Sequence, residues 1–539
     1  MGHQELDIRR LIGRWWLPER TGFPRTLDEL TFRNVVVLFA VSLMAYFYID
    51  VGPRARILPG KQEEHRTDFT VYTEAGSAFF DGRKPYEVGN PRSWTYIYPP
   101  LLALMVAPLS LLDSEAQALV WFTLSAILCL GSYEEARRIW RFLLPTEKGD
   151  ARLDPSGRWV GLCAGMTMFL PTLACLQRGQ VGIVLLYSLL LGYRLILTSR
   201  NRPTLLLGGV LLAWPVVVKL VPALPVGFLV WQHWLLALGR ERSRHDFVRA
   251  SILSLSIMAG VFLFLLALPG AVLGWNANLR HLQTWSRKVV TCEDPGSSYK
   301  AFLDSTNNQS FGNAVHLLVA RWRVERPDDL RHLLLRLAKT PAERQIAEDE
   351  AATKMRIADT TTQRWIQISK GVMLALLLGV ALVPSRSDRL GHAVTFGLAC
   401  LGILLISPVA WTHYFMMALP AVLFFPPWLS RRGYSRIARW MAGTPVLLVW
   451  LHFLAKEWIG PYGFLGLSTT GWFLIACVLM IREGILDLRS DSTSRPPRAV
   501  ASQSRQWYGP HRRSRKEDQA LLDERLVTLD ECAAKRTAR

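Results

Sequence analysis

Long apolar runs that follow one another along the chain constrain its fold more than any other feature. About twelve runs occur, at residues 34–49, 119–133, 160–176, 181–197, 204–218, 220–238, 250–273, 366–383, 392–406, 411–429, 444–454 and 465–481. Most approach the roughly 20 residues that a helix needs to cross a bilayer, and flanking aromatic residues extend them into the interface. The eleventh run is the weakest. With half of its residues hydrophobic, the chain is predicted to be an all-α integral membrane protein with about 12 transmembrane helices.

The charge distribution predicts how these helices are oriented. The formal net charge is +20, and the basic residues cluster in short turns and in the C-terminal tail. Such clusters mark cytoplasmic connections under the positive-inside rule, so no nucleic-acid partner is expected. Six arginines within residues 1–33 place the N-terminus in the cytoplasm. The basic clusters within residues 200–202, 240–244, 386–389 and 431–432 then lie on the cytoplasmic side as well.

The same pattern predicts the domain organisation. Residues 1–33 form a basic cytoplasmic N-terminus, residues 34–484 the multi-span domain, and residues 485–539 a basic cytoplasmic tail that is partly disordered. Residues 53–114 form the first outer loop, with an interfacial helix at 98–112, because Pro99, Pro100 and Pro108 interrupt that segment. Residues 275–365 form a long outer loop, in which residues 324–364 are expected to be a charged helical pair. We expect a multi-pass protein of the plasma membrane.

Seven polar residues near the ends of the runs are all predicted to lie on the outer face. They are Asp68, Arg178, Gln180, Lys219, Asn308, Gln309 and His413. Polar and charged side chains near membrane depth are costly and usually functional. Their convergence on one face predicts a single extracytoplasmic site. The seven cysteines show no metal-ligand spacing, so we expect neither a metal nor another cofactor.

Among these residues, Asp68 is the best candidate for a general base. It begins an outer-loop segment that otherwise carries aromatic residues such as Phe69 and Tyr72. Transfer of a phosphate-linked sugar needs a base for the acceptor hydroxyl and cations for the departing phosphate. The alternative is a helix cap or a solvated carboxylate. Glu74 is a second, weaker candidate acid.

The remaining polar residues suit a phosphate and a sugar. Lys219, between two apolar runs, either binds an anion or extends toward the interface. Arg178 and Gln180 flank a glycine that permits close backbone approach. His413 either hydrogen-bonds the donor or anchors the chain at the interface. Asn308 and Gln309 suit sugar hydroxyls, and otherwise form an ordinary loop.

Short motifs occur in a specific order along the chain. They are Asp68 with Tyr72, Gly82-x-x-Pro85-Tyr86, Tyr98-Pro99-Pro100 with Pro108-Leu109, Gly179-Gln180, Lys219-Leu220-x-Pro222, Asn308-Gln309-Ser310 and Ser407-Pro408-x-x-Trp411-x-His413. From about residue 34 to residue 429 the chain resembles the bacterial polyprenol-phosphate-mannose-dependent α-mannosyltransferase family. It departs from that family at His413-Tyr414, where the family often has two adjacent histidines, and in its longer, more charged segment 324–364.

This resemblance implies a membrane bundle of the GT-C type and an inverting, single-displacement reaction. Asp68 would be the base, and Lys219, Arg178 or His413 would meet the charge of the departing polyprenyl phosphate. The donor would be a polyprenyl-phosphate sugar, the acceptor a glycan or glycolipid, and the active site would face away from the cytoplasm.

Two other classes stay open from the sequence. A transporter would favour internal repeats, which this chain lacks, and helices broken near the midplane. A polymerase or ligase for lipid-diphosphate glycans would favour a large outer loop with several arginines and a histidine. Residues 275–364 contain such residues.

Overall fold

The computed structural model describes residues 41–144, 155–239, 243–291, 308–324, 360–384 and 388–493, apart from residues 59, 61–63 and 93. Within these ranges the protein is a helical bundle. Its β-type pairing there consists of two isolated β-bridges, Gly89 with Thr95 and Asn308 with Trp411. The basic N-terminus, most of the expected charged pair at 324–364 and most of the C-terminal tail lie outside the described residues.

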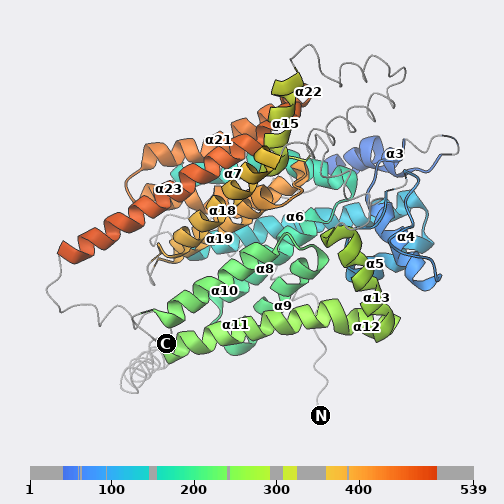
Figure 1. The fold of residues 1–539 in the computed structure, drawn as a ribbon, viewed down its shortest axis with the longest axis horizontal. Coiled ribbons are helices and arrows are strands. Elements are labelled where there is room, and N and C mark those ends of the chain that lie inside the picture. The colour runs from blue at the N-terminus through green and yellow to red at the C-terminus, as the bar shows by residue number, and fades with distance from the viewer. Residues whose placement is uncertain are drawn as a thin grey trace, which may run out of the picture.

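Seven helical stretches of the described chain are long and apolar enough to cross a membrane. They are α6 (Ser114–Leu143), α7 (Pro155–Arg178), α11 (Arg244–Phe262) continuing through η4 (Leu263–Ala267) into α12 (Leu268–Leu273), α18 (Thr360–Ala381), α19 (Arg389–Ile406), α21 (Ser435–Leu454) and α23 (Phe464–Thr493). Figure 1 shows these helices side by side in one bundle. The prediction of an all-α, multi-span membrane protein is confirmed.

Shorter apolar helices complete the bundle. They are α8 (Gly182–Thr198), α9 (Arg202–Val218), α10 (Ala223–Leu238) and α20 (Leu419–Arg431), which follows the 3₁₀ segment η6 (Thr412–Ala418). Nearly all of their bounds lie within a few residues of the apolar runs that predict them. The weakest run, 444–454, is the second half of α21, whose first turns carry Arg436 and Arg439 and so lose apolar character.

The remaining helices are short. Figure 1 places α3, α4, α5 and α13 close to one another at one end of the bundle. The short elements are η1 (Phe47–Val51), α3 (Gly52–Ala55), α4 (Phe69–Phe80), α5 (Pro100–Val106), η3 (Ala107–Leu111), α13 (Trp275–Trp285), η5 (Ser286–Val290), α15 (Phe311–Val324), α22 (Lys456–Ile459) and η7 (Gly460–Tyr462). The segment predicted to be an interfacial helix is α5 with η3, and it changes from α-helix to 3₁₀ beside Pro108.

Local sequence explains where several helices start. Asp113 caps α6 by accepting a hydrogen bond from the amide of Ala116 at 2.8 Å, and Asn201 caps α9 through the amide of Thr204 at 2.9 Å. Such caps satisfy amides that have no partner within the helix. Pro203 in the first turn of α9 lacks the amide hydrogen that would need one. The chain therefore reverses direction between α8 and α9 within a few residues.

Two apolar clusters stabilise the protein, one between the long helices and one at the end of the bundle that carries α4 and α5. The larger fills the space between the long helices. The smaller joins α4 and α5 to the ends of α6, α8 and α9, and it is rich in aromatic side chains. Phe69 stacks on Trp121 at 4.7 Å between ring centroids, and Tyr72 meets Tyr98 edge-on at 5.5 Å. This aromatic cluster supports the loop that begins α4.

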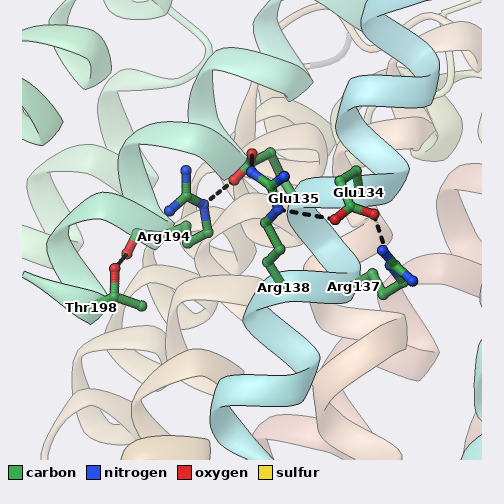
Figure 2. Close-up of polar contacts among 6 residues, drawn as sticks. All are labelled: Glu134, Glu135, Arg137, Arg138, Arg194 and Thr198. Carbon is green, nitrogen blue, oxygen red and sulfur yellow. Dashed lines mark hydrogen bonds and ion pairs between the residues drawn. The ribbon is translucent and has the colours of Figure 1, made fainter. Parts of the chain in front are cut away.

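A buried carboxylate ties α6 to α8, as Figure 2 shows. Glu135 is only 2% exposed. It accepts hydrogen bonds from Arg138 at 3.1 Å and from Arg194 of α8. An unpaired carboxylate at this depth would be costly, so the pairing fixes how the two helices pack against each other. Arg194 lies one turn before the end of α8 at Thr198, which is the end far from Gln180.

Candidate active site

Asp68 is held by the short turn that joins α7 to α8. Its backbone amide donates to the carbonyl of Arg178 at 2.8 Å, and the side-chain amide of Gln180 donates to its carboxylate. Asp68 occupies the N-cap position of α4, yet its side chain makes no capping hydrogen bond. The carboxylate therefore does not serve as the helix cap that the sequence left as an alternative.

A glycine allows these two segments to touch. Gly179 has φ +66°, and a Cβ atom built on it would lie 2.9 Å from both the Cβ of Phe69 and the Oγ1 of Thr67. Only glycine tolerates both the left-handed backbone and this close approach. The sequence Gln177-Arg178-Gly179-Gln180 thus places Arg178 and Gln180 against the residue before α4.

Lys219 points into the protein from the turn between α9 and α10. Its ammonium donates to the hydroxyl of Tyr414 and lies 3.4 Å from the hydroxyl oxygen of Tyr98. It also lies 3.6 Å from the centroid of the Tyr414 ring, within the range of a cation–π contact. These contacts turn the ammonium away from the interface, and anion binding by Lys219 stays a prediction. Burial lowers the pKa of Lys219 to about 7.

The surroundings of Asp68 act on the pKa of its carboxyl in two opposite directions. Burial raises the pKa of its carboxyl above the ordinary value, whereas the charge of Arg178 and the hydrogen bond from Gln180 oppose this rise. Lys219 and Arg92 lower the pKa of the same carboxyl through their charges. The Arg178 side chain forms no ion pair with a carboxylate of the described chain. Its charge is therefore available to an anionic ligand.

His413 brings a fourth segment to the site. The imidazole is 2% exposed and lies parallel to the Trp411 ring, with 6.4 Å between the ring centroids. Its Nε2 atom has no hydrogen-bond partner among the described residues. A buried nitrogen without a partner costs free energy unless a ligand supplies one. The charges of Arg178 and Lys219 both act on this imidazole, so the three groups lie in one region.

Asn308 and Gln309 position the segment that carries His413. The Asn308 side chain donates to the carbonyl of Pro408 at 2.9 Å and accepts from the amide of Ala410 at 2.9 Å. Gln309 donates through its backbone to the carbonyl of Ala410 at 2.7 Å and through its side chain to the carbonyl of Gly460 at 3.3 Å. Both residues are fully buried. Direct contact of these amides with sugar hydroxyls stays a prediction.

Four residues at the site were not singled out from the sequence as binding groups: Arg92, Tyr72, Tyr98 and Tyr414. Tyr72 donates to the side-chain oxygen of Gln180 at 3.5 Å, and the other two tyrosines contact Lys219. Tyr72 and Tyr98 belong to the sequence motifs of the first outer loop, and those motifs could have indicated a role at the site. For Tyr414, the only indication in the sequence is its position directly after His413.

Glu74, the weaker candidate acid, lies apart from these groups. Its side chain is 46% exposed and faces Arg83, with 3.7 Å between the carboxylate oxygen and the guanidinium nitrogen. No group of three His, Cys, Asp or Glu residues in the described ranges could hold a metal ion.

A comparison with protein families identifies the class of this protein. A family model described as glycosyltransferase family 87 matches residues 96–408, more than half of the chain. The chain belongs to glycosyltransferase family 87. This family 87 protein is thus a membrane glycosyltransferase that acts with a sugar donor and an acceptor at a bilayer. A search of curated proteins finds no match.

The matched residues include only part of the site. Arg178, Gln180, Lys219, Asn308 and Gln309 lie within them, whereas Asp68 and His413 lie outside. The assignment of a base therefore depends on the geometry around Asp68, and family membership alone does not supply it.

Proposed function

We propose that this family 87 enzyme transfers a hexose from a polyprenyl-phosphate carrier to a hydroxyl of a lipid or glycan acceptor. The resemblance of its motifs to polyprenol-phosphate-mannose-dependent enzymes of the GT-C type favours mannose. One observation carries the proposal. A carboxylate, two cations and a buried imidazole come together from four segments at one end of a membrane bundle. This set supplies a base for the acceptor and positive charge for a phosphate leaving group.

In the proposed reaction Asp68 takes the proton of the acceptor hydroxyl. The acceptor oxygen attacks the anomeric carbon of the sugar, and the bond between that carbon and the phosphate oxygen breaks. The electron pair leaves with the polyprenyl phosphate, and the configuration at the anomeric carbon inverts. Gln180 orients the carboxylate through its hydrogen bond. An oriented base in contact with the acceptor saves the entropy of bringing the groups together.

Arg178, Lys219 and His413 meet the departing phosphate in this mechanism. Lys219 is held by the hydroxyls of Tyr98 and Tyr414, so its ammonium is already in place before the donor binds. Preorganised charge of this kind stabilises the transition state without reorganisation. A bound phosphate would also restore the full charge of Lys219, whose pKa burial lowers to about 7.

The charge pattern supports a location in the plasma membrane with this site on the extracytoplasmic face. Polyprenyl-phosphate sugars suit that location because the polyprenyl chain lies in the bilayer and holds the sugar at its surface. The acceptor must then present its hydroxyl at the same surface.

The test uses membranes that contain the full-length enzyme. They are incubated with radiolabelled polyprenyl-phosphate-mannose, with the matching glucose donor, and with a soluble nucleotide-mannose. We expect label to pass from polyprenyl-phosphate-mannose to a lipid or glycan product of opposite anomeric configuration, and Asp68→Asn membranes to show little transfer. Transfer from the nucleotide sugar with the polyprenyl donor inactive would overturn the proposed donor, and faster transfer of glucose would overturn mannose.

A further inference from the structure

A cavity lined by arginines lies at the opposite end of the bundle from Asp68. Its volume is about 1090 Å³, and its walls come from α8, α9, α10, α11 and α19. Residues from Thr198 to Arg202 line it, at the ends of α8 and α9 that are far from Gln180 and Lys219. Each of these helices has 17 residues, so roughly 25 Å of helix separates the two sites.

The mouth of this cavity is strongly basic. Among the described residues, five arginines line it, and Asp246 is the one carboxylate: Arg200, Arg202, Arg244, Arg249 and Arg389. Arg200, Arg202 and Arg244 are exposed and form no ion pair with a carboxylate of the described chain. Arg249 is fixed, because its guanidinium donates to the backbone carbonyls of Ser199 at 3.3 Å and of Ile196. Positive charges around one cavity repel one another, and a bound anion would offset this repulsion.

The inner wall of the cavity is mostly apolar. Ile196, Leu205, Leu229 and Ile252 line it, together with the polar side chains of Tyr193, His233, His392 and Gln232. Gln232 is 3% exposed, and neither its amide nitrogen nor its amide oxygen makes a hydrogen bond with any residue that the structure describes. A buried amide without partners costs free energy, which hydrogen bonds from a ligand would recover. This residue therefore points to a polar ligand group that reaches past the arginines.

We propose that this cavity binds the phosphate-bearing headgroup of an anionic membrane lipid. The exposed arginines bind the phosphate oxygens, Gln232 binds the polar part next to the phosphate, and the apolar wall contacts the start of the chains. Basic pockets between the ends of membrane helices suit such headgroups, and arginine is well shaped for phosphate. A free phosphate ion would use the arginines alone and leave both the apolar wall and the amide without a contact.

The test measures thermal unfolding of the full-length enzyme in detergent with added ligand. The three ligands are short-chain phosphatidylglycerol, phosphatidylcholine of the same chain length, and inorganic phosphate. We expect only phosphatidylglycerol to raise the unfolding midpoint in a saturable way. An equal effect of inorganic phosphate would overturn the lipid assignment, and so would a saturable effect of phosphatidylcholine or no saturable effect at all.

Matched variants locate the binding. Removing one arginine is expected to weaken phosphatidylglycerol binding about fivefold, the value of roughly 1 kcal/mol per basic group. Arg200→Gln, Arg202→Gln and Arg244→Gln are measured singly and together. The control removes the same charge at the same end of the bundle, with Arg431→Gln, Arg436→Gln and Arg439→Gln, which are exposed and line no part of the cavity. Equal losses in both sets would overturn the site.

Gln232→Leu separates a ligand site from an empty cavity. In a ligand site this change weakens phosphatidylglycerol binding by on the order of tenfold, because the polar contact is lost. It also raises the midpoint of the unliganded enzyme, since two unpartnered atoms are removed. A gain in stability with unchanged lipid affinity would contradict the assignment of the amide to the site.

Discussion

At the scale of single residues, the site holds two opposite charges in surroundings that disfavour both. Burial raises the pKa of Asp68 and lowers the pKa of Lys219 to about 7. Neither group relies on a direct ion pair with the other. Gln180 donates to the carboxylate, and two tyrosine hydroxyls contact the ammonium. Perturbed charges of this kind are common at functional sites, which supports the proposed roles of Asp68 and Lys219.

The first prediction concerns Asp68. Asp68→Asn keeps size and can still accept the hydrogen bond from Gln180, but it cannot take a proton. Turnover should fall by about 10²–10⁴-fold, the usual contribution of a general base, while donor binding stays near normal. Because burial raises the pKa of the carboxyl, its ionisation at neutral pH costs stability, so the unfolding midpoint should not fall. Glu74→Gln, on the exposed face of α4, should stay active. Loss of turnover in that variant instead would refute the assignment.

The second prediction concerns the pH dependence of kcat/KM. Activity should rise as the pH increases through the pKa of Asp68, since the base must lose its proton. It should fall again above about pH 7 as Lys219 loses its charge. Lys219→Ala should lower turnover on the order of 10²-fold.

The variant Lys219→Arg gives the sharper measurement. An arginine keeps its charge at every accessible pH, so the fall above neutral pH should disappear even though the planar side chain restores only part of the turnover. Lys84→Arg, at an exposed lysine of the first outer loop, is the control and should keep the profile of the unaltered enzyme. An alkaline fall that persists in Lys219→Arg would assign that titration to another group.

At the scale of elements, the turn between α7 and α8 is the part that joins the bundle to the loop that carries Asp68. It supplies the backbone carbonyl that binds the amide of Asp68, and the side chain that binds its carboxylate. It can do both because Gly179 lets the backbone lie against Thr67 and Phe69.

The third prediction compares two glycines with the same backbone requirement. Gly179 has φ +66° and Gly433 has φ +87°, but a Cβ atom at Gly433 meets nothing within 4 Å. Both changes to alanine should cost roughly 1 kcal/mol of stability from the left-handed backbone. Only Gly179→Ala should also displace Asp68 from Gln180, and an error of about an ångström can cost on the order of 10²-fold in turnover. Equal turnover in the two variants would mean that the turn does not position the base.

The sequence predicts the elements well and their contacts less well. Apolar runs give α8, α9 and α19 within a few residues, because burial in lipid demands uninterrupted apolar helices. Asp68, Arg178 and Lys219 stand out because charge at membrane depth is rare. The partners of Lys219 could not be predicted, since Tyr98 and Tyr414 are far from it in sequence and tyrosines are common at membrane interfaces. The roles of Asn308 and Gln309 depend on a bridge to Trp411 that no local pattern encodes.

At the scale of the whole molecule, the two ends of the bundle differ in their chemistry. One end holds the carboxylate, the two cations and the imidazole of the candidate active site. The other end holds the arginine-lined cavity, and close to it Glu135 ties α6 to α8. Charges at both ends, with apolar helices between them, fix the depth of the bundle in a bilayer. Under the positive-inside rule they also predict its direction, with the arginine-lined end on the cytoplasmic side.

The last prediction tests that direction. Native Cys292 and Cys532 are first replaced by serine, and the other five cysteines are buried or half-buried within the bundle. A cysteine is then placed at exposed Lys84, in the predicted first outer loop, or at exposed Arg431, in the predicted cytoplasmic turn at the end of α20. An impermeant thiol reagent added to intact cells should label Lys84→Cys and leave Arg431→Cys unlabelled. Both should react after the cells are opened. Labelling of Arg431→Cys alone in intact cells would mean that the orientation in the membrane is the reverse of the predicted one. The donor would then have to reach the site from the cytoplasm.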